Sequence, residues 1–214
     1  MTLEQALCAA LAMIAGASTA SAQEPGDYSV PEPVTFLDRY GFGLTIGGGV
    51  SGFTGDTMRD TTDDGGSWDI RATFGTRSFV AVEGSYLGSA QEIDTFGLDN
   101  AAVLISNGIQ ADVRLNATVD IDVQPFLYAG VAWRRYDVMN ADFNTSDIQD
   151  EDDVLELPMG FGVAWRGAGF LLDARAEFRG ATSEDMVPAA ITEDRNDAAA
   201  MHRWGINASL GYEW

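Results

Sequence analysis

Residues 204–214 read WGINASLGYEW, and their apolar side chains fall on every second position. Successive side chains of a β-strand point to opposite faces, whereas a helix repeats its apolar positions every three or four residues. The stretch therefore predicts a strand with one apolar and one polar face. Its apolar face carries Trp204, Ile206, Ala208, Leu210, Tyr212 and Trp214.

The same two-residue period recurs in seven upstream segments, at 40–53, 68–76, 79–88, 103–116, 125–135, 155–166 and 170–180. No helical pattern long enough to compete occurs after residue 22. The connections at 75–78, 116–124 and 166–169 are short, whereas those at 54–67, 89–102, 137–153 and 180–201 are long and polar. Such alternation, between strands of about 9–11 residues, is typical of antiparallel membrane barrels. The predicted fold class is all-β: an eight-stranded, antiparallel, up-and-down transmembrane β-barrel with short periplasmic turns and long extracellular loops.

A soluble lipocalin-like barrel shows the same alternation with its apolar face inside. The composition of the polar face must therefore distinguish a membrane barrel from a soluble one. Glycines crowd that face in the first and sixth strands, at Gly41, Gly43, Gly47, Gly49, Gly160 and Gly162. Small residues suit the narrow interior of eight strands. Charges on this face are nearly balanced, and buried ions need partners. The predicted interior charge network comprises Arg71, Glu83, Asp112, Arg114, Arg134, Glu156, Arg166, Asp173, Arg175, Glu177 and Arg179, with Asp69 and Glu213 on the same face.

The pentapeptide GVAWR occurs twice, at 130–134 and 162–166. Neighbouring strands run in opposite directions, so Trp133 is predicted at the long-loop rim and Trp165 at the short-turn rim. Tryptophan gathers at both interfaces of a membrane. The predicted aromatic girdle is Trp68, Trp133, Trp165, Trp204 and Trp214. Pro158 lies within the sixth strand and lacks an N–H, which predicts a bulge or an unpaired register there.

The N-terminal segment has the pattern of a secretory signal. Residues 6–17, ALCAALAMIAGA, are uncharged and apolar but shorter than the roughly 20 residues that span a bilayer. Ala20-Ser21-Ala22 fits a small-x-small cleavage site, so we predict a signal peptide at 1–22, although Lys and Arg are missing from its start. A short periplasmic segment at 23–39 and the barrel at 40–214 follow. Cys8 is the sole cysteine, so the mature chain is predicted to lack thiol chemistry.

Together, the cleavable signal, the eight alternating segments and the stretch GINASLGYEW resemble Gram-negative outer-membrane β-barrel proteins of the small OmpA-transmembrane-domain or opacity-protein type. The stretch VQPFLYAGVAWRRY at 123–136 also looks like that family's fifth strand, with its Pro-aromatic-x-x-Gly pattern. The resemblance covers about 40–214. It implies an outer-membrane location, and recognition of Leu210, Tyr212 and Trp214 by the barrel-assembly machinery. It implies no shared reaction.

Acidic residues dominate the composition. The 214 residues include 33 acidic and 12 basic side chains, all of the latter Arg, for a net charge of −21. This charge argues against nucleic acid or anionic lipid headgroups as direct partners. The densest cluster, DIQDEDD, could bind Ca²⁺ and bridge to lipopolysaccharide phosphates, or form solvated, mutually repelling loops. The candidate ligands are Asp147, Asp150, Glu151, Asp152 and Asp153; no other cofactor is expected.

His202 is the sole histidine and lies just before the last strand. Some eight-stranded outer-membrane barrels are lipid A-modifying enzymes that use a His near one rim. Asp197 or Glu193 could orient the imidazole here, but no nucleophile is evident, so no catalytic residue is assigned.

The sequence thus predicts a non-enzymatic, monomeric outer-membrane barrel with a plugged, charged lumen. Its expected role is envelope integrity or surface interaction through acidic loops, among outer-membrane lipids and lipopolysaccharide. The alternatives are a narrow ion or small-solute channel, a lipid A-modifying enzyme, and a lipocalin-like periplasmic binder.

Overall fold

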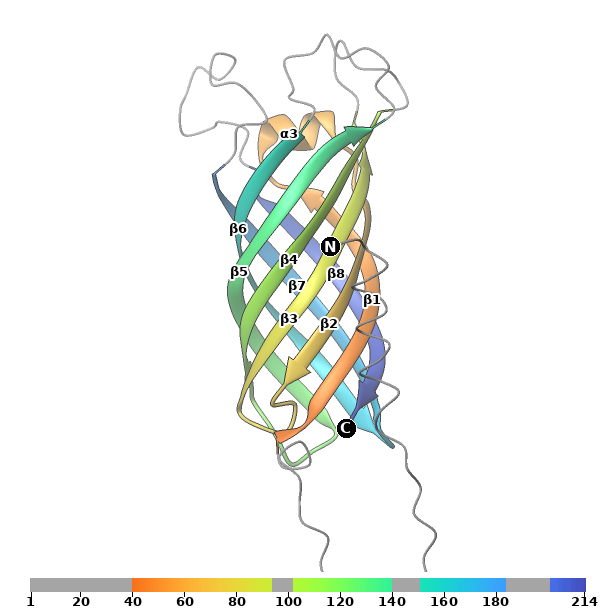
Figure 1. The fold of residues 1–214 in the computed structure, drawn as a ribbon, viewed down its shortest axis with the longest axis vertical. Coiled ribbons are helices and arrows are strands. Elements are labelled where there is room, and N and C mark those ends of the chain that lie inside the picture. Colours follow the sequence, from red (N-terminus) through yellow and green to blue (C-terminus); the bar gives the residue numbers. More distant parts are fainter. Residues whose placement is uncertain (1–39, 94–101, 140–150, 184–200) are drawn as a thin grey trace, which may run out of the picture. The chain divides into compact units, whose positions relative to one another are not determined.

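The chain forms an eight-stranded antiparallel barrel in which each strand pairs with its neighbours in chain order (Figure 1). The structure, a computed structural model, describes residues 40–93, 102–139, 151–183 and 201–214. The predicted fold class is confirmed. The strands are β1 (Phe42–Phe53), β2 (Gly65–Phe74), β3 (Val80–Glu92), β4 (Val103–Asn116), β5 (Val123–Met139), β6 (Glu151–Gly167), β7 (Phe170–Ser183) and β8 (Arg203–Glu213). The predicted signal peptide at 1–22 and the segment at 23–39 lie outside the described residues.

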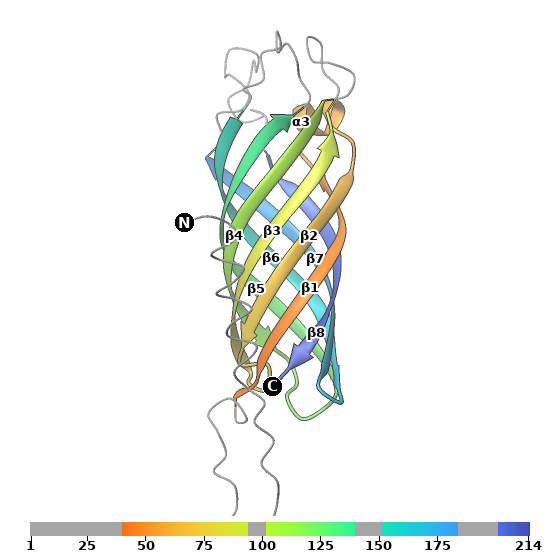
Figure 2. The ribbon, with the colours of Figure 1, turned by 45° about the vertical axis from the view of Figure 1, so that its right-hand side comes forward.

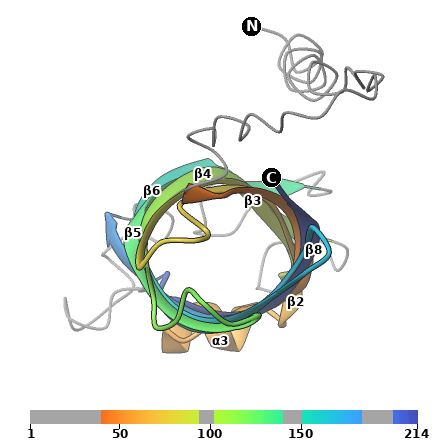
Figure 3. The same cartoon turned by 90° about the horizontal axis from the view of Figure 1, so that it is seen from below.

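Pairing between the first and last strands closes the barrel into a ring (Figure 3). The ladder runs from Gly43 opposite Glu213 to Phe53 opposite Arg203. Backbone hydrogen bonds between Phe42 and Trp214 extend it, at 3.2 Å from the Phe42 N–H and 2.8 Å from the Trp214 N–H. Closure satisfies the backbone groups that an open sheet would leave exposed at its edges.

The two ends of the barrel differ. One, the turn end, has short connections such as Ala168-Gly169, which joins β6 to β7 with positive φ angles of 52° and 82°. The other, the loop end, carries the long connections and the short helix α3 (Asp56–Thr61), shown from a second side in Figure 2. This helix corrects the expectation of an irregular loop at 54–67. In the described part of the chain, no helix is long and apolar enough to cross a membrane.

A group of apolar side chains fills the barrel interior at the loop end. Here the structure departs from a uniformly polar lumen. Met58 of α3 and Met201, just before β8, are fully buried there. We call this group the loop-end cluster; its buried members are Phe53, Met58, Ile93, Ala102, Leu104, Tyr136, Val154 and Met201. It caps the polar interior and gives α3 an anchor, which explains why a helix forms in a polar segment.

Apolar side chains otherwise cover the outside of the strands. Ile46, Leu127 and Phe161 are 61–65% exposed, and they alternate with inward residues. Charged outward positions gather at the loop end, at Glu92 and at Arg135, Asp137 and Asp153, leaving an apolar band around the strands. The lipocalin-like alternative requires the opposite arrangement, with this apolar set inside, and the structure contradicts it.

Pro158 interrupts one of the ladders of β6. Between β5 and β6, pairing runs to Ala129 opposite Met159 and resumes at Ala132 opposite Glu156 with the register unchanged. On the other side Pro158 pairs opposite Arg179. The unpaired register expected at this proline is therefore present, and the β6–β7 bulge lies nearby, between Leu155 and Glu156.

Candidate functional site: the charged lumen

Ionisable side chains project into the barrel from seven of the eight strands. Their spacing by two residues keeps them on the inner face. Those from β7 (Asp173, Arg175, Glu177 and Arg179) form a row that runs from the turn end toward the loop end. The inward-facing set contains seven arginines and seven acids: Arg71, Arg114, Arg134, Arg166, Arg175, Arg179 and Arg203 with Asp69, Glu83, Asp112, Glu156, Asp173, Glu177 and Glu213.

Three arginines and three acids form what we call the turn-side network: Arg71, Arg114 and Arg175 with Asp69, Glu83 and Asp173. Glu83 is completely buried and lies 3.0 Å from Arg175 and 3.1 Å from Arg114. Arg175 also donates two hydrogen bonds of 2.9 Å to Asp173. Arg71 lies 3.2 Å from Asp69. Within the network the opposite charges are equal in number, as buried ions require.

Two aromatic rings from β5 pack inside the barrel against this network. The Arg114 guanidinium lies 3.6 Å from the centroid of the Phe126 ring, and that of Arg175 lies 4.8 Å from the Tyr128 ring. Such cation–π contacts favour guanidinium groups away from water. The rings occupy the space that Gly160 and Gly162 of β6 leave free, because a Cβ at either position would overlap them.

The loop-side network consists of Arg134, Tyr136, Glu156, Glu177 and Arg179. Glu156 lies 3.3 Å from Arg134 and 3.2 Å from Arg179, and it accepts a 2.8 Å hydrogen bond from Tyr136. Arg179 donates two more bonds, of 2.8 and 3.0 Å, to Glu177. The buried Glu156 carboxylate of β6 thus contacts one arginine from each of the two neighbouring strands, β5 and β7.

Arg203 is a buried cation that the sequence reasoning missed. It is 1% exposed and donates to the hydroxyls of Tyr136, Ser51 and Ser89 at 2.8–2.9 Å. Within the described residues no carboxylate pairs with it. Its position could have been found by extending the alternation of 204–214 back by one residue, because Arg203 then falls on the polar face.

Asp112 and Arg166, the remaining predicted network residues, form no ion pair with either network, although Asp112 lies opposite Glu83 in the β3–β4 ladder. Asp112 accepts a 2.6 Å hydrogen bond from Gln110, and no arginine of the described residues forms an ion pair with it. At the turn end, Arg166 donates to the backbone carbonyls of Thr76 and Val119 and lies 3.7 Å from Glu213. The predicted network is therefore divided into separate clusters.

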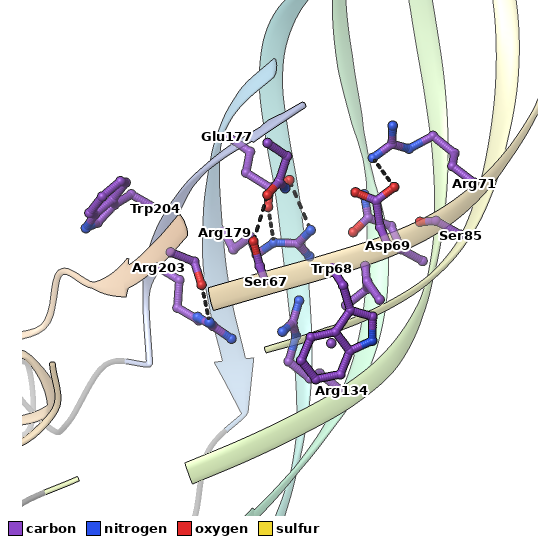
Figure 4. Close-up of a pocket in the computed structure, with 15 residues that line it drawn as sticks. Ser67, Trp68, Asp69, Arg71, Ser85, Arg134, Glu177, Arg179, Arg203 and Trp204 are labelled. Carbon is purple, nitrogen blue, oxygen red and sulfur yellow. Dashed lines mark hydrogen bonds and ion pairs between the residues drawn. The ribbon is translucent and has the colours of Figure 1, made fainter. Parts of the chain in front are cut away.

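A small polar cavity remains between the two networks (Figure 4). Arg71 and Asp69 line one side, and Arg134, Arg179 and Arg203 line the other, with Glu177 beside Arg179. Its volume is about 20 Å³. That is room for roughly one or two water molecules.

The closed barrel was compared with known proteins. No family model matches the chain, and no curated protein sequence matches it significantly. The solved structure of Neisserial surface protein A (NspA) matches 81% of this chain and 97% of its own, at a TM-score of 0.57 and 14% identity. The outer membrane protein OprG from Pseudomonas aeruginosa matches 81% of this chain and 95% of its own, at a TM-score of 0.53 and 11% identity. The chain has the fold of an eight-stranded outer-membrane barrel. The resemblance found in the sequence is thus confirmed at the level of the fold.

In this outer-membrane barrel fold Trp68, Trp165, Trp204 and Trp214 lie close to strand ends, whereas Trp133 lies well before the end of β5 at Met139. Trp68, Trp133 and Trp165 are 39–45% exposed on the outer face, and Trp204 and Trp214 are half-buried. Trp133 precedes the outward Arg135 at the loop-end edge of the apolar band, and Trp165 is near the turn end of β6. Leu210 and Tyr212 face outward on β8 beside Trp214, whose ring contacts that of Tyr212 at 5.0 Å.

The candidate calcium cluster lies mostly outside the described residues. Asp147 and Asp150 are not described, nor are the side chains of Glu151 and Asp152; Asp153 is exposed on β6 opposite Arg135. Among the described residues, no group of three or more His, Cys, Asp or Glu side chains is placed to hold a metal ion. Calcium binding by this cluster stays a prediction.

His202 has structural contacts at the loop end of the barrel. Its Nδ1 accepts a 3.0 Å hydrogen bond from the Ala181 N–H, and its ring packs edge-on against Phe178 at 5.9 Å. Asp197 and Glu193, its candidate partners, lie outside the described residues. Since Nδ1 already accepts from the backbone, an acid could orient this ring only through Nε2.

Proposed function

We propose that this protein is a non-enzymatic barrel of the Gram-negative outer membrane, with an occluded lumen and a role carried out by its acidic loop-end surface. The observation that carries the proposal is the pairing of an apolar exterior with an ion-paired interior. The role would be envelope integrity or surface interaction, and we expect a monomer.

The exterior supports a location in a lipid bilayer. Each of the eight strands carries large apolar residues at outward positions, and soluble monomers rarely expose contiguous apolar patches of that extent. Charged outward positions gather at the loop end, where a protein that spans the membrane would meet headgroups and water. The outward tryptophans near the strand ends fit interfacial anchors.

The interior supports occlusion. Glu83 of β3 contacts Arg175 of β7 as well as Arg114 of β4, so these side chains cross the lumen, and Glu156 of β6 joins Arg134 and Arg179 from the two strands beside it. Phe126 and Tyr128 fill further space, and the loop-end cluster covers the interior above them. Eight strands leave an interior that side chains just fill. A cavity of about 20 Å³ does not make a continuous path for a hydrated ion, which disfavours the channel alternative.

A lipid A-modifying activity is disfavoured by the contacts of His202. This histidine packs against Phe178 and accepts from the backbone, and neither contact activates a nucleophile. General base catalysis needs the imidazole within hydrogen-bond reach of the group it deprotonates. If lipid A mass spectra changed on expression of the protein but not of its His202→Ala variant, the enzyme alternative would replace our proposal.

The loop-end surface is proposed to meet lipopolysaccharide through divalent cations. Asp63, Asp64 and Asp153 are exposed there, and the chain as a whole carries a net charge of −21. Direct contact with phosphates would be repulsive, whereas Ca²⁺ bridges oxygen ligands on both partners. Protease protection of the loops on addition of Ca²⁺, but not of Na⁺ at equal ionic strength, is the expected result. Equal rates of loop cleavage in Ca²⁺ and in Na⁺ would show that divalent cations do not bind these loops.

The location is tested by the electrophoretic mobility of the membrane fraction before and after boiling. A folded outer-membrane barrel should resist detergent when unheated and change its mobility when boiled. Recovery of the protein in the soluble periplasmic fraction would overturn the proposed location.

Occlusion is tested separately by conductance in planar bilayers, with the heat-dependent shift showing that each sample is folded. We expect no discrete conductance steps. Steady, ion-selective openings from folded protein would show that the lumen conducts, and the narrow-channel alternative would then hold.

A further inference from the structure

Arg203 stands out among the interior arginines because its ordinary counter-charge is missing. The side chain is 1% exposed, and its hydrogen-bond acceptors, which include Ser51, Ser89 and Tyr136, are all neutral. Its Nε has no hydrogen-bond partner. A buried ion without an opposite charge is strongly disfavoured. The sequence compensates the other arginines of both networks with carboxylates, so this one requires a separate explanation.

The surroundings of Arg203 are cationic rather than neutral. Arg134 lies close by, because Ser89 and Ser106 connect the two: Arg203 donates to Ser89 at 2.9 Å, Arg134 donates to Ser106 at 2.8 Å, and the two hydroxyls are 2.8 Å apart. With Arg179, this end of the lumen holds three guanidinium groups. Two carboxylates, Glu156 and Glu177, face them. Among the groups in contact here, one positive charge is left over. The remaining inward acid, Asp112, lies opposite Glu83 in the β3–β4 ladder, accepts from Gln110 and forms no ion pair with these arginines.

The cavity adjoins this surplus charge. Arg134, Arg179 and Arg203 all line it, as Figure 4 shows. Ser51 is a lining residue too. Ser51 accepts a hydrogen bond from Arg203 and therefore keeps its own O–H to donate. The cavity thus presents positive charge and a hydroxyl donor to whatever occupies it.

We propose that this cavity binds one small monovalent inorganic anion, such as chloride, which neutralises Arg203. The two carboxylates that also line the cavity do not fill this role. Asp69 is 3.2 Å from Arg71, and Glu177 is held by two hydrogen bonds from Arg179. The cavity volume of about 20 Å³ limits the ligand to a single ion of roughly the size of water and excludes phosphate esters and organic acids.

The position of the site predicts that the anion is a structural component of the folded barrel. The loop-end cluster covers the cavity toward the loops, and the rings of Phe53 and Tyr136 lie 5.0 and 5.7 Å from the Arg203 guanidinium. An ion that binds the folded but not the unfolded chain stabilises the fold by mass action. This inference is independent of the proposed envelope role, because an occluded barrel could equally hold water here.

The direct test is to refold and crystallise the full chain in sodium bromide and to measure anomalous scattering. We expect one bromide peak in the cavity in contact with Arg203. A cavity that holds only water, or bromide found solely on the outer surface, would refute the site.

A second test follows unfolding by urea at constant ionic strength while chloride replaces gluconate, which is too large for the cavity. Above its Kd, each tenfold rise in chloride should increase the folded-to-unfolded ratio of the wild type about tenfold. The Arg203→Gln variant should lose this dependence, whereas Arg135→Gln, on the outer face of β5, should keep it. A wild type insensitive to chloride, or an Arg203→Gln variant as sensitive as the wild type, would contradict the proposal. If Arg203→Gln fails to fold, the bromide experiment on the wild type still decides.

Discussion

Glu83 shows how closely the lumen depends on single side chains. It is completely buried and lies within 3.1 Å of guanidinium groups from β4 and β7. The desolvation of a buried ion pair offsets much of its attraction, so the net contribution of the network to stability is small when it is complete. Removing one member is different, because it leaves the partners charged and without compensation.

We therefore expect Glu83→Gln to destabilise the barrel by about 3–5 kcal/mol. The free energy of unfolding in lipid vesicles, from urea titration, is the measurement. Asp137→Asn is the matched control: Asp137 lies 3.7 Å from Arg135 with about a third of its side chain exposed, so its loss should cost at most about 1 kcal/mol. Equal effects of the two substitutions would show that burial does not govern these pairs.

The inward glycines are predicted to be necessary for space rather than for backbone freedom. A methyl group at Gly162 would overlap the Phe126 ring and the backbone carbonyl of Ala174. Gly162→Ala should therefore cost about 1–3 kcal/mol through overpacking. Gly84, which faces outward, has no atom within 4 Å of the same added group. Gly84→Ala should be neutral or slightly stabilising, by up to about 1 kcal/mol; a loss as large as that at Gly162 would rule out the steric reason.

At this scale the sequence predicted most of the lumen. The two-residue period assigns Glu83, Arg114 and Arg175 to the inner face without ambiguity, and their contacts follow from closure of the ring. It did not predict Arg203, because the apolar alternation of the last strand begins only at Trp204. The sequence also could not show which carboxylate pairs with each arginine. These pairs depend on the register between neighbouring strands, and the two-residue period does not determine that register.

Among the elements, the turn between β6 and β7 carries a correctable strain. Ala168 has a φ of 52°, a conformation that costs an L-residue roughly 1 kcal/mol. Asparagine tolerates it, and Asn-Gly is preferred in two-residue hairpins whose central residues both have positive φ. Ala168→Asn should raise the free energy of unfolding by about 0.5–1 kcal/mol. Ala168→Val should lower it, because a β-branched residue is poorly suited to this region; the reverse order would contradict the turn geometry.

Helix α3 is expected to depend on one anchor. Met58 is fully buried in the loop-end cluster, whereas the neighbouring Arg59 is exposed and offers a trypsin site. Met58→Ser should release the helix and speed cleavage after Arg59, because proteolysis follows the population of the opened segment. The barrel itself should keep its heat-dependent mobility. Asp63→Ser, at an exposed position beyond the helix, is the control and should not change the cleavage rate. Unchanged cleavage of Met58→Ser would mean that other contacts hold α3.

The elements were predicted in number and order but not in length. Strand β5 continues to Met139, and strand β6 begins at Glu151, so both reach into the stretch 137–153 that was expected to be a loop. Backbone pairing persists there after the apolar alternation ends. The loop-end cluster was missed for a related reason. Met58, Ile93 and Met201 are isolated apolar residues in polar segments, and only the closed barrel brings them together.

In the molecule as a whole, charge is separated by location. Seven arginines and seven acids offset each other inside, so the net charge of −21 belongs to the rest of the chain. The apolar band lies between the two rims. If that band is in a bilayer, the tryptophans near its edges report its position.

Single-tryptophan variants that retain Trp133 or Trp165 should both be quenched more by lipids brominated near the headgroup than by lipids brominated near the chain end. The reason is that these residues lie near opposite edges of the apolar band, where tryptophan meets a membrane interface. A variant with Trp at outward position 46, where Ile46 is 65% exposed in the middle of β1, should show the opposite depth preference. Equal quenching at every depth would indicate that the strands do not cross a bilayer in this orientation.

Pairing of β1 with β8 has a consequence for how the chain is made. Gly43 and Glu213 are neighbours in the ring although 170 positions separate them in sequence, and such non-local contacts form late because their loop-closure entropy must be overcome first. Until β8 arrives, the glycine-rich edge of β1 has no partner and is open to pairing with another chain. We therefore expect the first strand to need shielding during biogenesis until the last one arrives.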